Sequence, residues 1–171
     1  MPEQLIERVA RTQPSTLNEQ DRSVEALIAT EDAILAADPV RREMIDEVLL
    51  MDGLQGPPDS VRLITRHAWM SGIDVVLGSV RDLRIERSAD GTKHLIGRLY
   101  FATTDEGEKA WRLVLEGHVT DVSVGALPAS REPIPRGHSR NVGGRVLRAE
   151  ARRIALIPAW TSREVTLTSV G

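Results

Sequence analysis

Residues 103–125 read TTDEGEKAWRLVLEGHVTDVSVG and predict a helix that leads directly into a strand. Thr103 and Glu106 have the spacing of a capping box, in which a hydroxyl and a later carboxylate satisfy free amide groups at a helix start. Apolar residues then recur at helical spacing, and Gly117 suits the position that follows many helix ends. Beyond it, the alternating residues of a short strand carry Ser123. A serine at this place is a candidate nucleophile, although many structural strands contain one.

The other segments with strand patterns make the chain β-rich. Strands are expected over 23–30, 47–51, 75–87, 94–102, 145–157 and 165–170. Residues 33–37 form a further short apolar segment, residues 61–66 are ambiguous, and the proline- and glycine-containing residues 128–144 are expected to form a surface loop. Gly78 is the expected site of a bulge or close approach, and Ala89-Asp90-Gly91 indicates a hairpin turn.

These elements predict one α+β domain, a small β-barrel with a few helices packed outside. Residues 1–20 are polar, and Pro14 and Ser15 interrupt their short helical pattern, so we expect a weakly ordered N-terminal arm. Residues 21–171 then form the domain, and a chain of this length buries about 70% of the surface that its unfolded form exposes.

The composition excludes several classes of site. The 171 residues contain no cysteine, so disulfides, thiolate metal sites and cysteine nucleophiles are excluded. No apolar run has the roughly 18 residues that a membrane-spanning helix needs, and a reducing cytoplasm is the expected compartment. The net charge of −3 does not favour nucleic-acid binding.

Arginines are nevertheless concentrated late in the chain. Residues 131–163 contain eight arginines against only Glu132 and Glu150. We interpret them as a solvated loop and strand face; the alternative is a basic patch for nucleic acid or an acidic partner. Trp160 is the one aromatic residue of this stretch, which therefore lacks the interleaved aromatic residues that single-strand binders use for stacking.

Serine hydrolysis requires a nucleophile, a base within hydrogen-bond reach and a group that orients the base. The chain has four candidate bases, His67, His94, His118 and His138. None lies three or four residues from another, so no helical metal pair is predicted, and no sequence motif indicates a cofactor. An offset of five residues along a strand would place His118 on the face opposite Ser123. Spacing alone leaves the choice among the histidines open.

Six stretches, taken together and in order, resemble the tailed-phage prohead maturation proteases. This family of capsid-processing serine proteases is related in fold to herpesvirus assemblin. The stretches are DEVLLMDGL (46–54), RLITRH (62–67), VLGSVRDLRIE (76–86), IGRLYFA (96–102), GEKAWRLVLEGHVTDVSVG (107–125) and WTSREVTLTSVG (160–171). The family pattern usually continues beyond the last stretch, which implies that this domain belongs to a longer protein.

The resemblance implies three catalytic residues. His67 matches the family's histidine, Ser123 its serine and Glu164 its late acidic residue. Ala68 stands where the family usually has a polar or acidic residue, and Ala126 where an aromatic residue often follows Ser-Val-Gly. Our hypothesis for the oxyanion hole is that backbone amides near residues 143–144 supply its donors.

The implied activity is that of a serine endopeptidase without cofactor or metal. Its substrates would be scaffold or major capsid protein segments, and its own flanks, inside the assembling procapsid in the host cytoplasm. The resemblance also implies a homo-oligomer, with a dimer as one form, and no membrane partner. The alternatives are an inactive protease-fold scaffold that assists shell assembly and a nucleic-acid-binding β-barrel.

Overall fold

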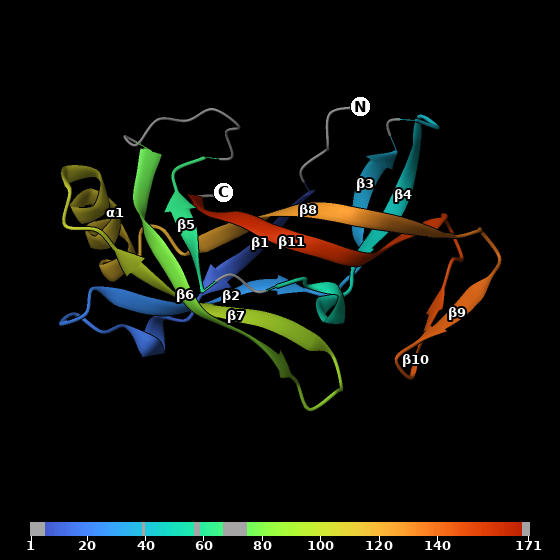
Figure 1. Cartoon of the computed structure of the whole chain (residues 1–171), viewed down its shortest axis with the longest axis horizontal. Coiled ribbons are helices and arrows are strands. Elements are labelled where there is room, and N and C mark those ends of the chain that lie inside the picture. The colour runs from blue at the N-terminus through green and yellow to red at the C-terminus, as the bar shows by residue number, and fades with distance from the viewer. Residues whose placement is uncertain (1–5, 39, 57–58, 67–74, 169–171) are drawn as a thin grey trace.

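The computed structural model describes residues 6–38, 40–56, 59–66 and 75–168. These residues form eleven strands, one α-helix and two 3₁₀ turns (Figure 1). The strands are β1 (Ile6–Thr12), β2 (Ser23–Thr30), β3 (Ile34–Asp38), β4 (Glu43–Leu49), β5 (Ser60–Ile64), β6 (Val76–Arg87), β7 (Lys93–Phe101), β8 (Asp121–Ile134), β9 (Ser139–Val142), β10 (Arg145–Arg148) and β11 (Ile154–Thr168). The 3₁₀ turns are η1 (Pro14–Thr16) and η2 (Met51–Gly53), and the helix is α1 (Asp105–Leu115).

Seven strands close into a barrel in the order β5-β6-β7-β2-β1-β8-β11, because β11 pairs with both β8 and β5. Strand β4 adds to the first residues of β11 in parallel, and β3 pairs with β4 outside it. Strands β9 and β10 form a separate two-stranded sheet. The expectation of a β-rich α+β barrel is therefore confirmed, with one α-helix in the described residues packed outside it.

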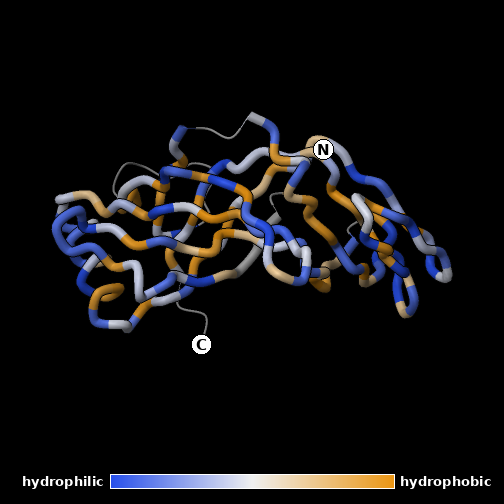
Figure 2. The backbone as a smooth tube through the Cα atoms, turned by 90° about the horizontal axis from the view of Figure 1, so that it is seen from below, coloured by the Kyte–Doolittle hydropathy of each residue, from blue (hydrophilic) through white to orange (hydrophobic). Residues whose placement is uncertain are grey.

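The described residues form two hydrophobic cores. The first residues of β11 contribute to the smaller core, and the rest of this strand contributes to the larger one. The larger core fills the barrel and includes Val124, Trp160 and Val165, all fully buried. The smaller core lies between β4, β10 and the adjoining ends of β8 and β11, and it includes Val48, Ile134 and Leu147. Figure 2 shows the resulting elongated shape, with hydrophilic hairpin tips at the end away from the barrel.

Helix α1 packs on the barrel at the β6–β7 side through Trp111, whose ring centroid is 5.5 Å from that of Phe101. Its N-cap is Thr104, whose hydroxyl accepts a hydrogen bond from the Gly107 amide at 3.2 Å, so the cap lies one residue later than the sequence predicts. Its end is as expected. Gly117 has φ of 78°, and the amides of Gly117 and His118 donate to Val114 and Leu113 in a Schellman motif.

Strand β6 confirms the expected role of Gly78. The pairing of β5 with β6 shifts register beside this residue, which is the signature of a bulge. A Cβ atom at this position would lie 1.9 Å from the backbone oxygen of Tyr100 on β7. Only glycine allows the two strands to approach this closely.

The N-terminal segment differs from the expected arm. Residues 6–12 form β1, which pairs with β2 on one side and with β8 on the other. Without this strand the barrel would be open between β2 and β8. Backbone pairing with β2 and β8 places β1 in the sheet, and the local pattern of side chains gives little indication of it.

The expected surface loop over 128–144 is also wrong for most of its length. Strand β8 continues to Ile134, and residues 139–142 form β9. Proline usually ends a central strand because it has no amide to donate. Among the described residues, β1 pairs with β8 as far as Ala126, and Pro128 and Pro133 lie in the part of β8 whose one described strand neighbour is β11. The ambiguous residues 61–66 contribute most of β5.

Candidate functional site

Ser123 and Glu164 lie on neighbouring strands and on the same face of the barrel wall. Ser123 on β8 is paired with Thr166 on β11, and Gly125 is paired with Glu164. Because side chains two residues apart on a strand share a face, the two sequence-predicted residues are diagonal neighbours. Ser123, Glu164 and Thr166 are only 3–4% exposed.

A β-bulge places Glu164 on this face. The β8–β11 register shifts between Ser162 and Glu164, so that Arg163 is the extra residue. Trp160 and Ser162 face the core before the bulge, and Val165 and Leu167 face it afterwards. Regular alternation would have pointed Glu164 into the apolar core. The bulge turns the carboxylate to the outward face instead.

The Glu164 carboxylate is held by an arginine from the next strand. Arg62 on β5 is paired with Glu164 in register, and its Nη2 atom donates to Oε2 of Glu164 at 2.7 Å. The carboxylate side chain is 5% exposed and the arginine side chain 44% exposed. A buried carboxylate requires such a partner, since desolvation of an unpaired charge is costly. Thr166 completes the row, with its hydroxyl 3.4 Å from the Ser123 backbone oxygen.

His67, the third member of the predicted set, lies outside the described residues. The chain can be followed to within one residue of it. Ile64, the last residue of β5, is paired with Thr166, which is itself paired with Ser123. The Thr65 amide then donates to the Val75 oxygen at 3.0 Å, which joins the chain on the two sides of residues 66–74. The strand that precedes His67 is therefore the one beside Glu164 and Thr166.

The three other histidines have different partners. His118 lies before β8, which begins only at Asp121, so the alternation that was expected to orient it does not apply; its Nε2 is 3.3 Å from Glu116. The His94 Nε2 atom forms a hydrogen bond with the Ser88 hydroxyl, across the β6–β7 hairpin. His138 is exposed, and its Nδ1 lies 3.3 Å from the Arg136 backbone oxygen.

The hypothesis that residues 143–144 supply oxyanion donors is wrong. Gly143 and Gly144 form the turn between β9 and β10, with φ values of 61° and 87°. Figure 1 shows this hairpin at the end of the molecule away from α1, whereas Ser123 is the third residue of β8, close to where the chain leaves α1. Most of the length of β8 lies between the two.

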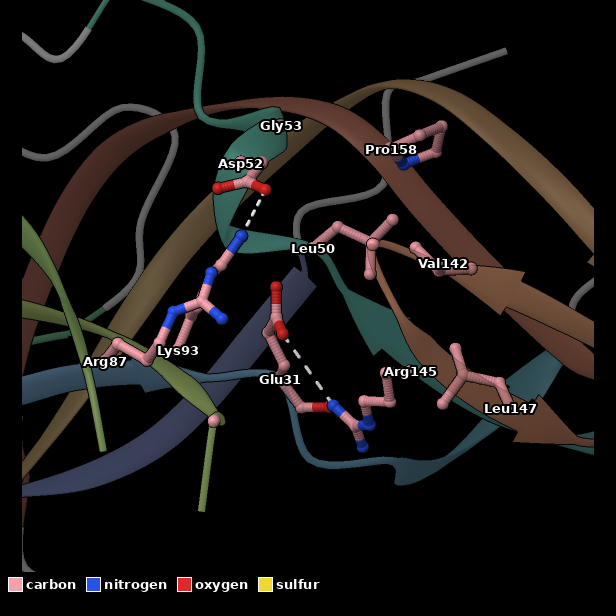
Figure 3. Close-up of a pocket in the computed structure, with 12 residues that line it drawn as sticks. Glu31, Leu50, Asp52, Gly53, Arg87, Lys93, Val142, Arg145, Leu147 and Pro158 are labelled. Carbon is pink, nitrogen blue, oxygen red and sulfur yellow. Dashed lines mark hydrogen bonds and ion pairs between the residues drawn. The ribbon is translucent and has the colours of Figure 1, made fainter. Parts of the chain in front are cut away.

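A pocket that no sequence motif indicates lies between the barrel and the β9–β10 hairpin (Figure 3). Its floor is apolar, with Leu50, Val142, Leu147 and Pro158, and its rim carries acids and bases. Lys93 forms an ion pair with Asp52, and Arg145 lies 3.7 Å from Glu31, whose Oε1 accepts from the Met51 amide at 2.8 Å. These residues come from several elements and turns that are far apart in the sequence, so no local sequence pattern could have grouped them. The Arg145–Glu31 pair joins the β9–β10 hairpin to the residues that follow β2, and the Lys93–Asp52 pair joins β7 to η2.

The arginine-rich stretch is largely occupied by ion pairs. Five of its eight arginines form ion pairs. Arg140 pairs with Glu132 of the same stretch, and four pair with acids elsewhere in the chain: Arg131 with Glu47, Arg145 with Glu31, Arg152 with Asp46, and Arg153 with Asp38 and Glu43. This supports their interpretation as part of the structural surface. It leaves less uncompensated positive charge for a nucleic acid than the sequence alone indicates.

Within the described ranges, no group of three or more histidine, aspartate or glutamate side chains stands close enough to hold a metal ion. The helix found there is too short and too polar to cross a membrane. No family model, curated protein or solved structure matches this chain.

Proposed function

We propose that this protein is a serine endopeptidase with Ser123 as nucleophile, His67 as general base and Glu164 as the residue that orients the base. The observation that carries the proposal is the arrangement of β8, β11 and β5. Residues 123 and 164 meet on one face, and the strand leading to residue 67 is paired beside them. These segments are separated by about forty residues or more in the sequence, and their adjacency in the barrel wall supports the proposal.

In the proposed reaction, His67 accepts the proton of the Ser123 hydroxyl as the oxygen attacks the scissile carbonyl. The tetrahedral species collapses to an acyl-enzyme, and His67 returns the proton to the leaving amine. Water, deprotonated by His67, then hydrolyses the ester. Glu164 accepts a hydrogen bond from the other ring nitrogen and stabilises the imidazolium.

Arg62 has a positioning role in this scheme. Its contact with one carboxylate oxygen fixes the orientation of Glu164 on the barrel wall. Charge-assisted hydrogen bonds are short and directional, and they keep a buried carboxylate in one rotamer. A fixed carboxylate in turn favours one orientation of the histidine ring.

The proposed substrates are scaffold and major capsid protein segments in an assembling phage head, together with the protease's own flanks. This part of the proposal rests on the six stretches that resemble prohead proteases. The same resemblance supports a homo-oligomer within the procapsid. The competing function is that of a catalytically inactive scaffold with the same fold.

The test is labelling by a fluorophosphonate probe, followed by intact mass analysis of the chain incubated with a capsid precursor. We expect labelling and cleavage in the native protein and neither in Ser123→Ala, because loss of a triad serine typically lowers turnover on the order of 10⁶-fold. Ser162→Ala is the matched control. Ser162 is equally buried on the adjacent strand but faces the core, and its Oγ has no hydrogen-bond partner in the described structure.

His67→Ala should be as inactive as Ser123→Ala, and Glu164→Gln should retain a measurable trace, since loss of the acid typically costs about 10⁴-fold. Equal labelling of the native chain and Ser123→Ala would overturn the choice of nucleophile. Absence of both labelling and cleavage, with the precursor present, would favour the inactive scaffold.

A further inference from the structure

Strand β3 is the outermost strand of the nine-stranded sheet and has β4 as its one neighbour in the described structure. An unpaired strand edge presents free amide and carbonyl groups, and proteins usually protect such edges with charges, proline or bulges. The first four residues of β3 are Ile-Leu-Ala-Ala, with none of these devices. The edge is therefore suited to pairing with another chain.

The direction of the backbone groups along β3 can be worked out from its neighbours. The Asp46 amide donates to the Arg153 oxygen at 3.0 Å, toward β11 and away from β3. Leu35, the partner of Asp46, is therefore in a non-hydrogen-bonded pair on the β4 side. Its amide and carbonyl point to the free edge, and by alternation those of Ala37 do as well. The edge thus offers two donors and two acceptors, arranged symmetrically about Ala36.

The side chains beside this edge are apolar and exposed. Leu35, Ala37 and Met44 share one face of the β3–β4 hairpin, as the pairing of Ala37 with Met44 shows. Leu35 is 54% and Met44 49% exposed, and Val40 in the connecting turn is 71% exposed. Leu35 and Met44 lie on the face of the sheet that also carries Val48 and Ile154, which are buried in the smaller core. The exposed apolar face of the hairpin is therefore continuous with that core.

We infer that β3 pairs with β3 of a second copy of this chain, antiparallel and about a two-fold axis through Ala36. In this register the outward groups of Leu35 meet those of Ala37 of the second copy, which makes four hydrogen bonds. Ala36 lies opposite its own counterpart, and Ile34 opposite Asp38, so no like charges are opposed. The Leu35 and Met44 side chains of both copies form one apolar surface.

Charge complementarity favours a second copy over an unrelated strand. Exposed Asp32 lies just before β3, and exposed Arg41 and Arg42 lie in the turn just after it. Antiparallel pairing brings the acidic residue before β3 of one copy close to the basic residues after β3 of the other copy, and the two-fold axis makes this contact twice. A two-fold interface requires this kind of self-complementary surface.

Cysteine cross-linking of the full chain tests both the edge and the register, because the native chain contains no cysteine. Ala36→Cys places two Cβ atoms directly opposite, about 4.5–5.5 Å apart, where a small adjustment allows a disulfide. Ile34→Cys is the matched control. It lies on the same face of the same strand, but the two cysteines would be about 14 Å apart along the strand direction.

We expect mild oxidation to give a covalent dimer with Ala36→Cys and not with Ile34→Cys. Sedimentation should show concentration-dependent dimers of the native protein and monomers of Leu35→Lys, with unchanged far-ultraviolet circular dichroism. A native chain that stays monomeric across the concentration series would overturn the inference, as would equal cross-linking of the two cysteine variants. Protection of the Leu35 and Ala37 amides only when an extended peptide is added would assign the edge to that peptide instead.

Discussion

Replacement of Arg62 by methionine tests how the Glu164 carboxylate is held on the barrel wall. The substitution removes the donor at 2.7 Å but keeps an unbranched side chain of similar reach. Breaking a fully buried ion pair costs about 3–5 kcal/mol, and a fully exposed pair contributes about 0–1 kcal/mol. Glu164 is 5% exposed and Arg62 is 44% exposed, so the pair lies between these limits. We expect Arg62→Met to lower the free energy of unfolding by about 2 kcal/mol.

Urea unfolding followed by tryptophan fluorescence measures this change, and a thermal scan should show a fall in Tm of about 4–8 °C for a chain of this size. Arg163→Met is the matched control, because Arg163 is exposed in the bulge next to Glu164. The double variant Arg62→Met/Glu164→Gln should recover part of the loss, because the neutral glutamine leaves no buried carboxylate charge that has lost its arginine partner. A loss below about 0.5 kcal/mol, the range of ordinary surface substitutions, would refute a structural role for this ion pair.

Three further predictions follow from local geometry. Gly78→Ala should destabilise the fold by on the order of 3 kcal/mol or more, because its Cβ would meet backbone rather than a movable side chain; an unchanged urea midpoint would contradict the close approach. Thr104→Ala should cost about 1 kcal/mol through loss of the N-cap, and Thr103→Ala much less; the opposite order in urea unfolding would restore the cap that the sequence indicates. The Arg41 amide, followed by the Val40 amide and Arg153, holds the pKa of Asp38 below its usual value. This stabilisation should be complete above the unfolded-state pKa of about 3.9 and lost as the pH falls through the lower folded-state pKa. As the pH is lowered through this range, the urea midpoint of unfolding should therefore fall less steeply for Asp38→Asn than for the native chain.

Elements with strong local patterns could be predicted from the sequence. Residues 23–30 are a compact apolar segment and form β2 with those bounds, and the turn at Ala89-Asp90-Gly91 joins β6 to β7. Gly117 ends α1 as its sequence position indicates. In these cases the side chains near in sequence carry the information that determines the structure.

Features that depend on distant partners could not be predicted. The bulge at Arg163 is visible only once β11 is aligned with β8, and Arg62 is 102 residues away from the carboxylate that it binds. Strand β1 owes its place to hydrogen bonds of its backbone with β2 and β8, which side-chain patterns do not report. The Ser123–Glu164 juxtaposition was expected from resemblance, and spacing along the chain alone did not supply it.

The fifteen residues of β11 impose an order on folding. This strand pairs with β4 in the smaller core and with β5 at the barrel closure, and it pairs with β8 along most of its length. During synthesis, neither core can close before residues 154–168 have left the ribosome, although most of their partners emerge much earlier. Contacts of such long sequence separation slow folding and leave apolar strands exposed in the meantime. The nascent chain is therefore expected to depend on chaperones until β11 has been synthesised.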